Sequence, residues 1–356
     1  MISKINMFDS WITGVMRIVD RHQASPKRFA QASRRVRLRL ITLVVLLWSG
    51  ALVIGANTYY VATNGPGGGA TTWATATNNI QDAISLCAVG DLVLVSNGVY
   101  ETGGVKNWPG GLGGTDLTNR VAITNAITVR SANNDPTNTI IKGSSPKGPA
   151  AVRCVFMTNN SWLIGFTLTN GATLSGGTSP TESNDYSGGG AWCSGAISNC
   201  IITGNSAQDM GAGVRGGTLF NCQLIGNTIG GNYSLSYGGG AAGSILSNCT
   251  IIGNSARGAG GADRCTMYNC SIIKNTPGGT CYGSMFNCTY ISNSTTVYGG
   301  GAQHPAKLDR CTFIGNSAVQ NGGGVGGAGC SVINCLFIGN SSGNSGGGAF
   351  FYSTGT

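Results

Sequence analysis

The segment NCIITGN, at Asn199–Asn205, decides the fold, because six later segments repeat its pattern. They are NCQLIGN at Asn221–Asn227, NCTIIGN at Asn248–Asn254, NCSIIKN at Asn269–Asn275, NCTYISN at Asn287–Asn293, RCTFIGN at Arg310–Asn316 and NCLFIGN at Asn334–Asn340. The spacing between neighbouring copies clusters near 22 residues, which is one turn of a three-sided coil. This period predicts a solenoid in which each repeat contacts only its neighbours.

Apolar and polar residues alternate around each repeat, as they do in a strand with one buried face. The position three residues before each cysteine is always apolar: Ile197, Leu219, Leu246, Met267, Met285, Leu308 and Val332. The position two residues after it is also apolar: Ile202, Leu224, Ile251, Ile272, Tyr290, Phe313 and Phe337. We therefore predict an all-β parallel β-helix of about 22-residue coils whose aligned columns form the core; the alternative is a β-sandwich of short strands.

Two further columns form a structural ladder inside this predicted stack. The first is made of Cys200, Cys222, Cys249, Cys270, Cys288, Cys311 and Cys335, and the second of Asn205, Asn227, Asn254, Asn275, Asn293, Asn316 and Asn340. Asn tolerates the left-handed turn conformation, and its amide can bond to the amide of the next coil. We expect the cysteines to be unbridged core thiols, since parallel side chains orient their sulfurs poorly for disulfides. Their spacing does not match a zinc site.

The N-terminal part of the chain differs from the repeats in charge and hydropathy. Through Arg39 it carries nine basic and two acidic residues, whereas the remainder has twelve basic and ten acidic residues and is nearly neutral. Arg34, Arg35, Arg37 and Arg39 lead into the uncharged segment Leu40–Ala56, which is typical of an export signal or membrane anchor. We expect the body to lie outside the cytoplasm, at the cell surface or beyond. The near-neutral body argues against nucleic-acid binding.

Four regions follow from these patterns: a basic region (1–39), a signal peptide or membrane anchor (40–56), a cap with early coils (57–175) and regular repeats (176–356) whose last coil is incomplete. Ile80, Ala83, Ile84 and Cys87 have helical spacing within Asn79–Ala88. We predict a short amphipathic helix there that covers the apolar N-terminal end of the stack.

Residues 58–356 resemble the right-handed parallel β-helix proteins of the pectin-lyase-like superfamily. The stretch from Ile80 through GDLVLVSNGVY is similar to the N-terminal cap of many exported members. The combination of Gly299–Ala302 with Phe313–Ala318 is similar to the repeats of chlamydial-type polymorphic outer-membrane proteins. The resemblance implies the fold, and it leaves open lyases, hydrolases, adhesins and inert spacers.

Carboxylates are the groups that a polysaccharide lyase or hydrolase would need, and the repeats contain few of them. Asp185 and Asp209 precede Gly-rich elements on successive coils, and Arg257 has a similar offset two coils on. They are candidate catalytic residues, with solvated loop charges as the alternative. Asp263, Asp309 and His304 are single, widely spaced residues, and His304 next to Pro305 is typical of a loop.

The predicted function is a non-catalytic exported scaffold that binds glycans or other cell-surface components along its flat faces. Repetition without a reactive constellation and outward Thr, Ser, Asn and Gln favour it. The alternative is a lyase or glycoside hydrolase that acts on an acidic polysaccharide. We expect no cofactor and no metal, except Ca²⁺ under the lyase alternative. Membrane contact is expected only through residues 40–56, if this segment is not cleaved.

Overall fold

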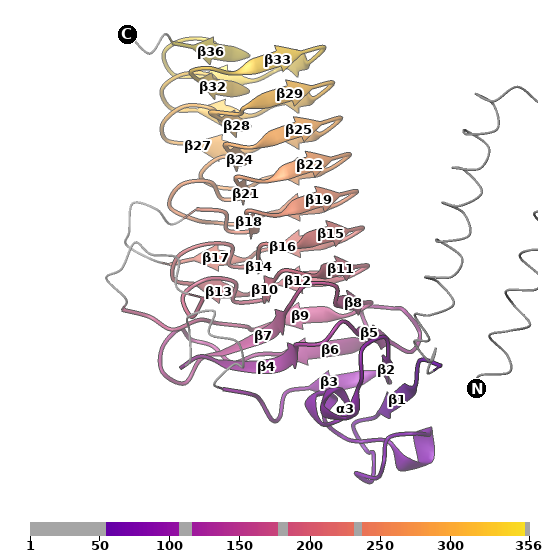
Figure 1. Cartoon of the computed structure of the whole chain (residues 1–356). Helices are drawn as coiled ribbons and strands as arrows, with labels where there is room; N and C mark the ends of the chain where they lie inside the picture. Colours follow the sequence, from indigo (N-terminus) through magenta and orange to yellow (C-terminus); the bar gives the residue numbers. More distant parts are fainter. Residues whose placement is uncertain (1–54, 107–115, 177–183, 231–236, 353–356) are drawn as a thin grey trace, which may run out of the picture. The chain divides into compact units, whose positions relative to one another are not determined.

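The computed structural model describes residues 55–106, 116–176, 184–230 and 237–352. The strands in these ranges join into three long sheets in which every neighbouring pair is parallel. From β2 onward, successive strands of the chain belong to different sheets, so the chain travels once around the stack in each coil (Figure 1). This arrangement confirms the predicted right-handed parallel β-helix, and the β-sandwich alternative, which has antiparallel sheets, is excluded.

The first sheet has eleven strands that follow one another in chain order. They are β1 (Thr58–Val61), β2 (Leu92–Val95), β5 (Thr128–Ser131), β8 (Trp162–Ile164), β11 (Ala196–Ser198), β15 (Thr218–Phe220), β19 (Ile245–Ser247), β22 (Thr266–Tyr268), β25 (Ser284–Phe286), β29 (Lys307–Asp309) and β33 (Ser331–Ile333).

The second sheet has ten strands: β4 (Thr118–Ile123), β7 (Val152–Met157), β10 (Ala191–Cys193), β14 (Val214–Arg215), β18 (Ala241–Ala242), β21 (Ala262–Asp263), β24 (Thr280–Cys281), β28 (Ala302–Gln303), β32 (Val325–Gly327) and β36 (Ala349–Phe351).

The third sheet also has ten: β3 (Gly98–Tyr100), β6 (Thr139–Lys142), β9 (Thr167–Thr169), β12 (Ile201–Thr203), β16 (Gln223–Ile225), β20 (Thr250–Ile252), β23 (Ser271–Ile273), β26 (Thr289–Ile291), β30 (Thr312–Ile314) and β34 (Leu336–Ile338). Two small sheets add β13 (Ser206–Ala207) with β17 (Thr228–Ile229), and β27 (Ser294–Thr295) with β31 (Ser317–Ala318) and β35 (Ser341–Ser342).

In-register pairing forms the core that the alternation predicts. The middle residue of each three-residue strand of the repeats in the first and third sheets, from β11 and β12 onward, points inward, so that Leu219 pairs with Leu246 in the first sheet and Leu224 with Ile251 in the third. All four side chains are fully buried. Near the C-terminal end of the described stack the third-sheet column becomes aromatic: Tyr290, Phe313 and Phe337 stack with centroid distances of 4.5 and 5.0 Å.

The helix α3 (Ile80–Leu86) lies at the N-terminal end of the stack, beside a 3-10 turn η1 (Trp73–Thr75) (Figure 1). The side chain of Asn79 caps α3 by accepting a hydrogen bond from the Gln81 N–H at 2.8 Å. Its apolar residues Ile80, Ala83 and Ile84 are buried, and α3 contacts β1, β2 and β4. The helix therefore covers the core at the end where the first coil has no neighbour.

The closing asparagines bond from coil to coil, and all of them except Asn340 are buried. Asn254 donates from its amide nitrogen to the Leu224 carbonyl at 2.9 Å and to Oδ1 of Asn275 at 3.0 Å. Its own Oδ1 accepts from the backbone N–H and the side-chain amide of Asn227, each at 2.9 Å. The same pattern links Asn205 through Asn340, so each side chain both donates and accepts within the interior.

The left-handed conformation lies at other positions than the sequence suggested. The closing asparagines do not adopt it; the first residue of each repeat does, with φ from 50° to 54° at Asn199, Asn221, Asn248, Asn269, Asn287, Arg310 and Asn334. The physical reason is that the closing asparagine must direct its amide along the stack, whereas the first residue makes the corner before the cysteine. The prediction that the ladder asparagines themselves make the left-handed turns is therefore wrong.

All thirteen cysteines are free thiols, and all but Cys330 and Cys335 are buried. Those of the ladder donate weak bonds to nearby carbonyls: the Cys222 thiol lies 3.2 Å from the Phe220 oxygen and 3.6 Å from the Ile197 oxygen. Burial raises the pKa of the Cys265 thiol, which lies outside the ladder, to about 12. Among the described residues, no group of three or more His, Cys, Asp or Glu side chains could hold a metal ion.

The segment Leu40–Ala56 falls, except for its last two residues, outside the described ranges. In the parts of the chain that the structure describes, no helix is long and apolar enough to cross a membrane. Export and anchoring therefore stay predictions.

We predict that Asn254→Ala lowers the free energy of unfolding by about 3 kcal/mol, because buried donors and acceptors on both neighbouring coils lose their partner. Asn254→Asp should cost more, since a carboxylate cannot donate to the Leu224 carbonyl or to Asn275. Urea denaturation followed by circular dichroism measures both values. The matched control is Asn269→Gly, at an exposed left-handed position that glycine accepts, with an expected change below about 1 kcal/mol. Equal effects at the two positions would contradict the role of the ladder.

Candidate functional site

Charged and aromatic side chains gather on the outward face of the second sheet and at the ends of its strands. Pairing aligns Trp192 on β10 with Arg215 on β14, then Ala242 on β18, Asp263 on β21 and Cys281 on β24. The residue after each of these strands forms a second column, which contains Arg264, Tyr282 and His304. We call Arg215, Arg264, Tyr282, His304, Tyr298 and Tyr352 the arginine–aromatic row.

Three bulky residues of the row adopt a backbone conformation that favours glycine. Arg264, Tyr282 and His304 have φ values of 49°, 55° and 45°, whereas the corresponding positions of the two earlier coils are Gly216 and Gly243. Such a conformation costs a non-glycine residue on the order of 1 kcal/mol. Strain that is kept on three successive coils indicates that these side chains serve a purpose other than stability.

The aligned backbones stack these side chains along the solenoid. Arg264 donates its backbone N–H to the Cys281 carbonyl, and Tyr282 donates to that of Gln303. The guanidinium carbon of Arg264 lies 5.3 Å from the centre of the Tyr282 ring, within cation–π range. The Tyr282 ring stacks on the His304 ring at 5.7 Å with an angle of 15°.

His304 is the centre of a cluster with two tyrosines. Its Nε2 lies 3.3 Å from the hydroxyl of Tyr298 and 3.3 Å from that of Tyr352, and the two hydroxyls are 3.4 Å apart. Its Nδ1 accepts a bond from the Ala328 N–H at 3.4 Å, so Nε2 carries the proton in the neutral ring. Partial burial lowers the pKa of His304, which keeps the ring neutral at pH 7.

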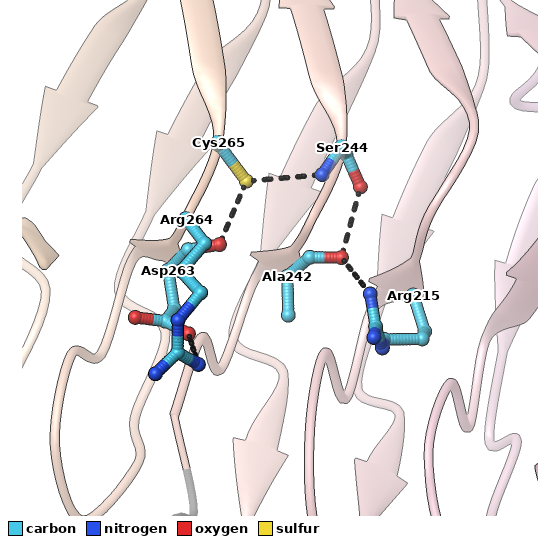
Figure 2. A network of polar contacts seen from close by, with 6 residues as sticks. All are labelled: Arg215, Ala242, Ser244, Asp263, Arg264 and Cys265. Carbon is cyan, nitrogen blue, oxygen red and sulfur yellow. Dashed lines mark hydrogen bonds and ion pairs between the residues drawn. The ribbon is translucent and has the colours of Figure 1, made fainter. Parts of the chain in front are cut away.

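Arg215 extends along the face toward Arg264. Its terminal nitrogen donates to the Ala242 carbonyl at 3.4 Å, as Figure 2 shows. A Cβ atom on Gly243 would lie 2.3 Å from that nitrogen, so the guanidinium occupies the space that the glycine leaves empty. Arg215 also lines a cleft of about 230 Å³, together with Asn184, Ser187, Trp192, Ser194 and the glycines at 216 and 217.

Asp263 lies beside Arg264 on one coil of this network, two coils from Arg215. Its side chain is 1% exposed. Its Oδ2 accepts a hydrogen bond from the Arg264 guanidinium at 3.0 Å, and the two groups form an ion pair (Figure 2). Oδ1 is buried without a hydrogen-bond partner among the described residues. Burial raises the pKa of the Asp263 carboxyl to about 6, and the positive charges of Arg264 and Arg215 oppose this rise. The carboxyl thus changes its charge close to neutral pH.

A buried arginine holds one wall of the cleft. Arg153 is 1% exposed and donates to the carbonyls of Ser187 and Gly188, each at 2.9 Å, and to that of Asn184. It also donates to Oδ1 of Asn119 at 2.7 Å. Burial lowers its pKa to about 10, so it stays charged at pH 7. Arg153 therefore fixes the segment that carries two of the cleft residues.

The three candidate residues from the sequence lie elsewhere. Asp185 is buried, accepts the Asp116 N–H at 3.3 Å and lies within electrostatic reach of Arg153. Asp209 is half-buried, and burial raises its pKa while Lys147 opposes the rise. The Asp209 N–H donates to the carbonyl of Tyr186, so the segments of the two acids are neighbours.

Arg257 is exposed in the loop before β21.

The sequence did not indicate Arg215, Arg264 or the tyrosines as candidates, and it presented Asp263 as an isolated acid. Arg215, Asp263 and Gln303 each follow a Gly–apolar pair, as in Gly261-Ala262-Asp263. Aligning the repeats on that pair rather than on the cysteine would have put them in one column. The prediction that His304 and Asp263 are isolated is wrong, because the coils bring each of them into a cluster.

Comparison with known proteins returns structural likenesses only. No protein-family model and no curated protein matches the sequence. A pectate lyase, Pel9A, is 15% identical with a TM-score of 0.46 over 82% of this chain and 78% of its own. A rhamnogalacturonan lyase is 15% identical with a TM-score of 0.40 over 81% of this chain and 74% of its own.

A pectin methylesterase is 12% identical with a TM-score of 0.38 over 72% of this chain and 80% of its own. At these values the likenesses carry no information about activity. The similarity of the repeats to polymorphic outer-membrane proteins also stays a prediction.

The raised pKa of Asp263 predicts a pH-dependent stability. The folded state favours the protonated carboxyl, so the stabilisation is complete near pH 4 and is lost as pH rises through about 6. Relative to Asp263→Asn, the wild-type chain should lose about 3 kcal/mol of unfolding free energy between pH 4 and pH 7.5. Urea unfolding of both proteins at the two pH values measures this loss. A difference that does not change with pH would contradict the assignment.

Proposed function

We propose that the arginine–aromatic row binds an acidic glycan that lies along the axis of the solenoid. The observation that carries the proposal is the strained left-handed backbone that presents Arg264, Tyr282 and His304 on successive coils. Strands repeat at about 4.8 Å, so the row offers groups at regular steps to an extended polymer. This corresponds to the non-catalytic, glycan-binding scaffold that the sequence predicted.

The chemistry of the row suits a chain of acidic sugars. Guanidinium groups bind carboxylates through paired hydrogen bonds, and Arg215 and Arg264 lie on the same face. The aromatic rings offer apolar surfaces with polar edges, which match the two characters of a sugar ring. Arg215, Arg264 and Asp263 together keep a net charge of +1 even when the carboxylate is ionised. The cleft beside Arg215 adds Asn184, Ser187 and Ser194 as hydrogen-bonding groups.

The proposed place of action is the cell surface or the medium outside the cell. The basic arginines before Leu40–Ala56 support export, and the repeats similar to those of polymorphic outer-membrane proteins support a surface scaffold. The partners would then be glycans of that surface or of its surroundings.

We predict that the protein binds polygalacturonate or alginate and does not bind a fully methyl-esterified polygalacturonate of equal length. Arg215→Gln and Arg264→Gln should each weaken binding about tenfold or more, because each removes a charged hydrogen bond. Isothermal titration calorimetry at constant salt measures the affinities. Arg310→Gln is the matched control, since Arg310 is an exposed arginine at the same left-handed geometry on the corner before the third sheet. An equal loss in the control, or equal binding of the neutral polymer, would exclude the row as the site.

A second candidate function is cleavage of the bound polymer. The observation that favours it is Asp263, a buried carboxyl beside Arg264 with a pKa of about 6, which is in the range of a general base. The test is an assay of polygalacturonate and alginate for new chain ends, with and without Ca²⁺. The scaffold proposal expects no turnover. Turnover that Asp263→Asn abolishes, with binding retained, would replace the scaffold by an enzyme. Asp209→Ala serves as the comparison variant, because Asp209 lies outside the row.

A further inference from the structure

We infer that Asp263 is a positioning residue that sets the effective charge of the arginine pair, so that the row binds anionic glycans more tightly when this carboxyl is protonated. The inference rests on the proposed glycan-binding function and adds its regulation. It starts from geometry: the carboxylate is buried, bonds Arg264 at 3.0 Å through one oxygen and leaves the other oxygen without a described partner.

An anion on the row and the carboxylate of Asp263 compete for the Arg264 guanidinium, and both interact with the charge of Arg215. Arg264 reaches Asp263 from its own coil, and Arg215 from β14 lies over Gly243, the glycine between them in the column. When Asp263 is ionised it neutralises one of the two positive charges and repels a bound carboxylate. When it is protonated both positive charges face the ligand. Because protonation of Asp263 and binding of the anion are thermodynamically linked, a bound anion in turn favours protonation of Asp263.

Arg264 keeps its place when the carboxyl loses its charge. The guanidinium is held on its other side by the ring of Tyr282, at 5.3 Å. A protonated carboxyl or an asparagine amide also still offers an oxygen that accepts its hydrogen bond. Protonation of Asp263 therefore strengthens the attraction of the anionic glycan more than it disturbs the position of the Arg264 guanidinium. The affinity for the glycan rises as the pH falls.

Arginines, thiols and phenols make up the other ionisable groups around Asp263. They are Arg215 from β14, Cys281 from β24, Cys265 and Arg264 from its own coil, Tyr237 before β18 and Tyr282 after β24. Burial raises the pKa of both thiols to about 12, and it raises the pKa of both phenols above the ordinary value of 10. Ionisation of Asp263, whose pKa is raised to about 6, is thus the change near neutral pH.

His304 is the one other group of the row that could titrate in this range. It lies one coil beyond Tyr282, and protonation would also add positive charge at low pH. Its partial burial lowers its pKa and so favours the neutral ring. A His304→Gln variant separates the two contributions.

The test measures the affinity of the full chain for a polygalacturonate oligosaccharide at pH 5.0 and pH 7.5 in constant salt. The carboxylates of this probe stay ionised above about pH 5. Wild type should bind about tenfold more tightly at pH 5.0, corresponding to a ligand-induced pKa rise of about one unit. Asp263→Asn should bind at pH 7.5 as tightly as wild type does at pH 5.0 and should show no such dependence. His304→Gln should keep the dependence of the wild type.

Three results would overturn the inference. They are an Asp263→Asn variant that keeps the tenfold dependence, one that binds more weakly than wild type at both pH values, and a His304→Gln variant that loses the dependence. Circular dichroism melting of each variant establishes that it is folded. Wild-type binding that is equal at both pH values overturns this inference and leaves the proposed function intact. Absence of binding at both pH values removes both.

Discussion

A buried asparagine links each coil of this solenoid to the next, and the rest of the structure depends on that link. The side chain of Asn254 makes bonds to Asn227, Asn275 and the Leu224 carbonyl, so one residue connects three coils. An amide that both donates and accepts in the interior has partners only if the coils are in register. The ladder therefore fixes register, and register determines which side chains meet in the core and on the surface.

The surface row is a consequence of that register. Arg215 and His304 are far apart in the sequence, and the loops between the strands vary in length. Parallel pairing nevertheless places them on one face, because each strand of the second sheet aligns with the one before it. The chain can thus keep a repetitive interior while the outward position after each Gly–apolar pair carries a different chemical group.

The fold could be predicted from the sequence because its causes repeat. Inward columns such as Leu224–Ile251 and the closing asparagines recur in copy after copy, and each repetition strengthens the inference. The backbone conformation of single asparagines could not be predicted from the sequence. Asn248 has the left-handed conformation and Asn254 does not, because the Asn254 amide must point along the stack to bond Asn275.

The candidate site escaped prediction for the opposite reason, since each of its residues occurs once. Asp263 looks isolated in a sequence, and its raised pKa follows from burial and from arginines on its own coil and two coils away. The position of the Arg215 guanidinium depends on the missing side chain of Gly243. Asp185 and Asp209, which the sequence favoured, prove to be neighbours on another part of the coil, beside Arg153 and Lys147 respectively.

The most direct test of the account is a crystal structure of the protein with a bound polygalacturonate oligosaccharide. The account predicts a sugar chain along the second sheet, with carboxylates at Arg215 and Arg264 and a sugar ring against Tyr282 or His304. An oligosaccharide on the outward face of the first sheet, where Trp162 and Tyr268 are exposed, would contradict it.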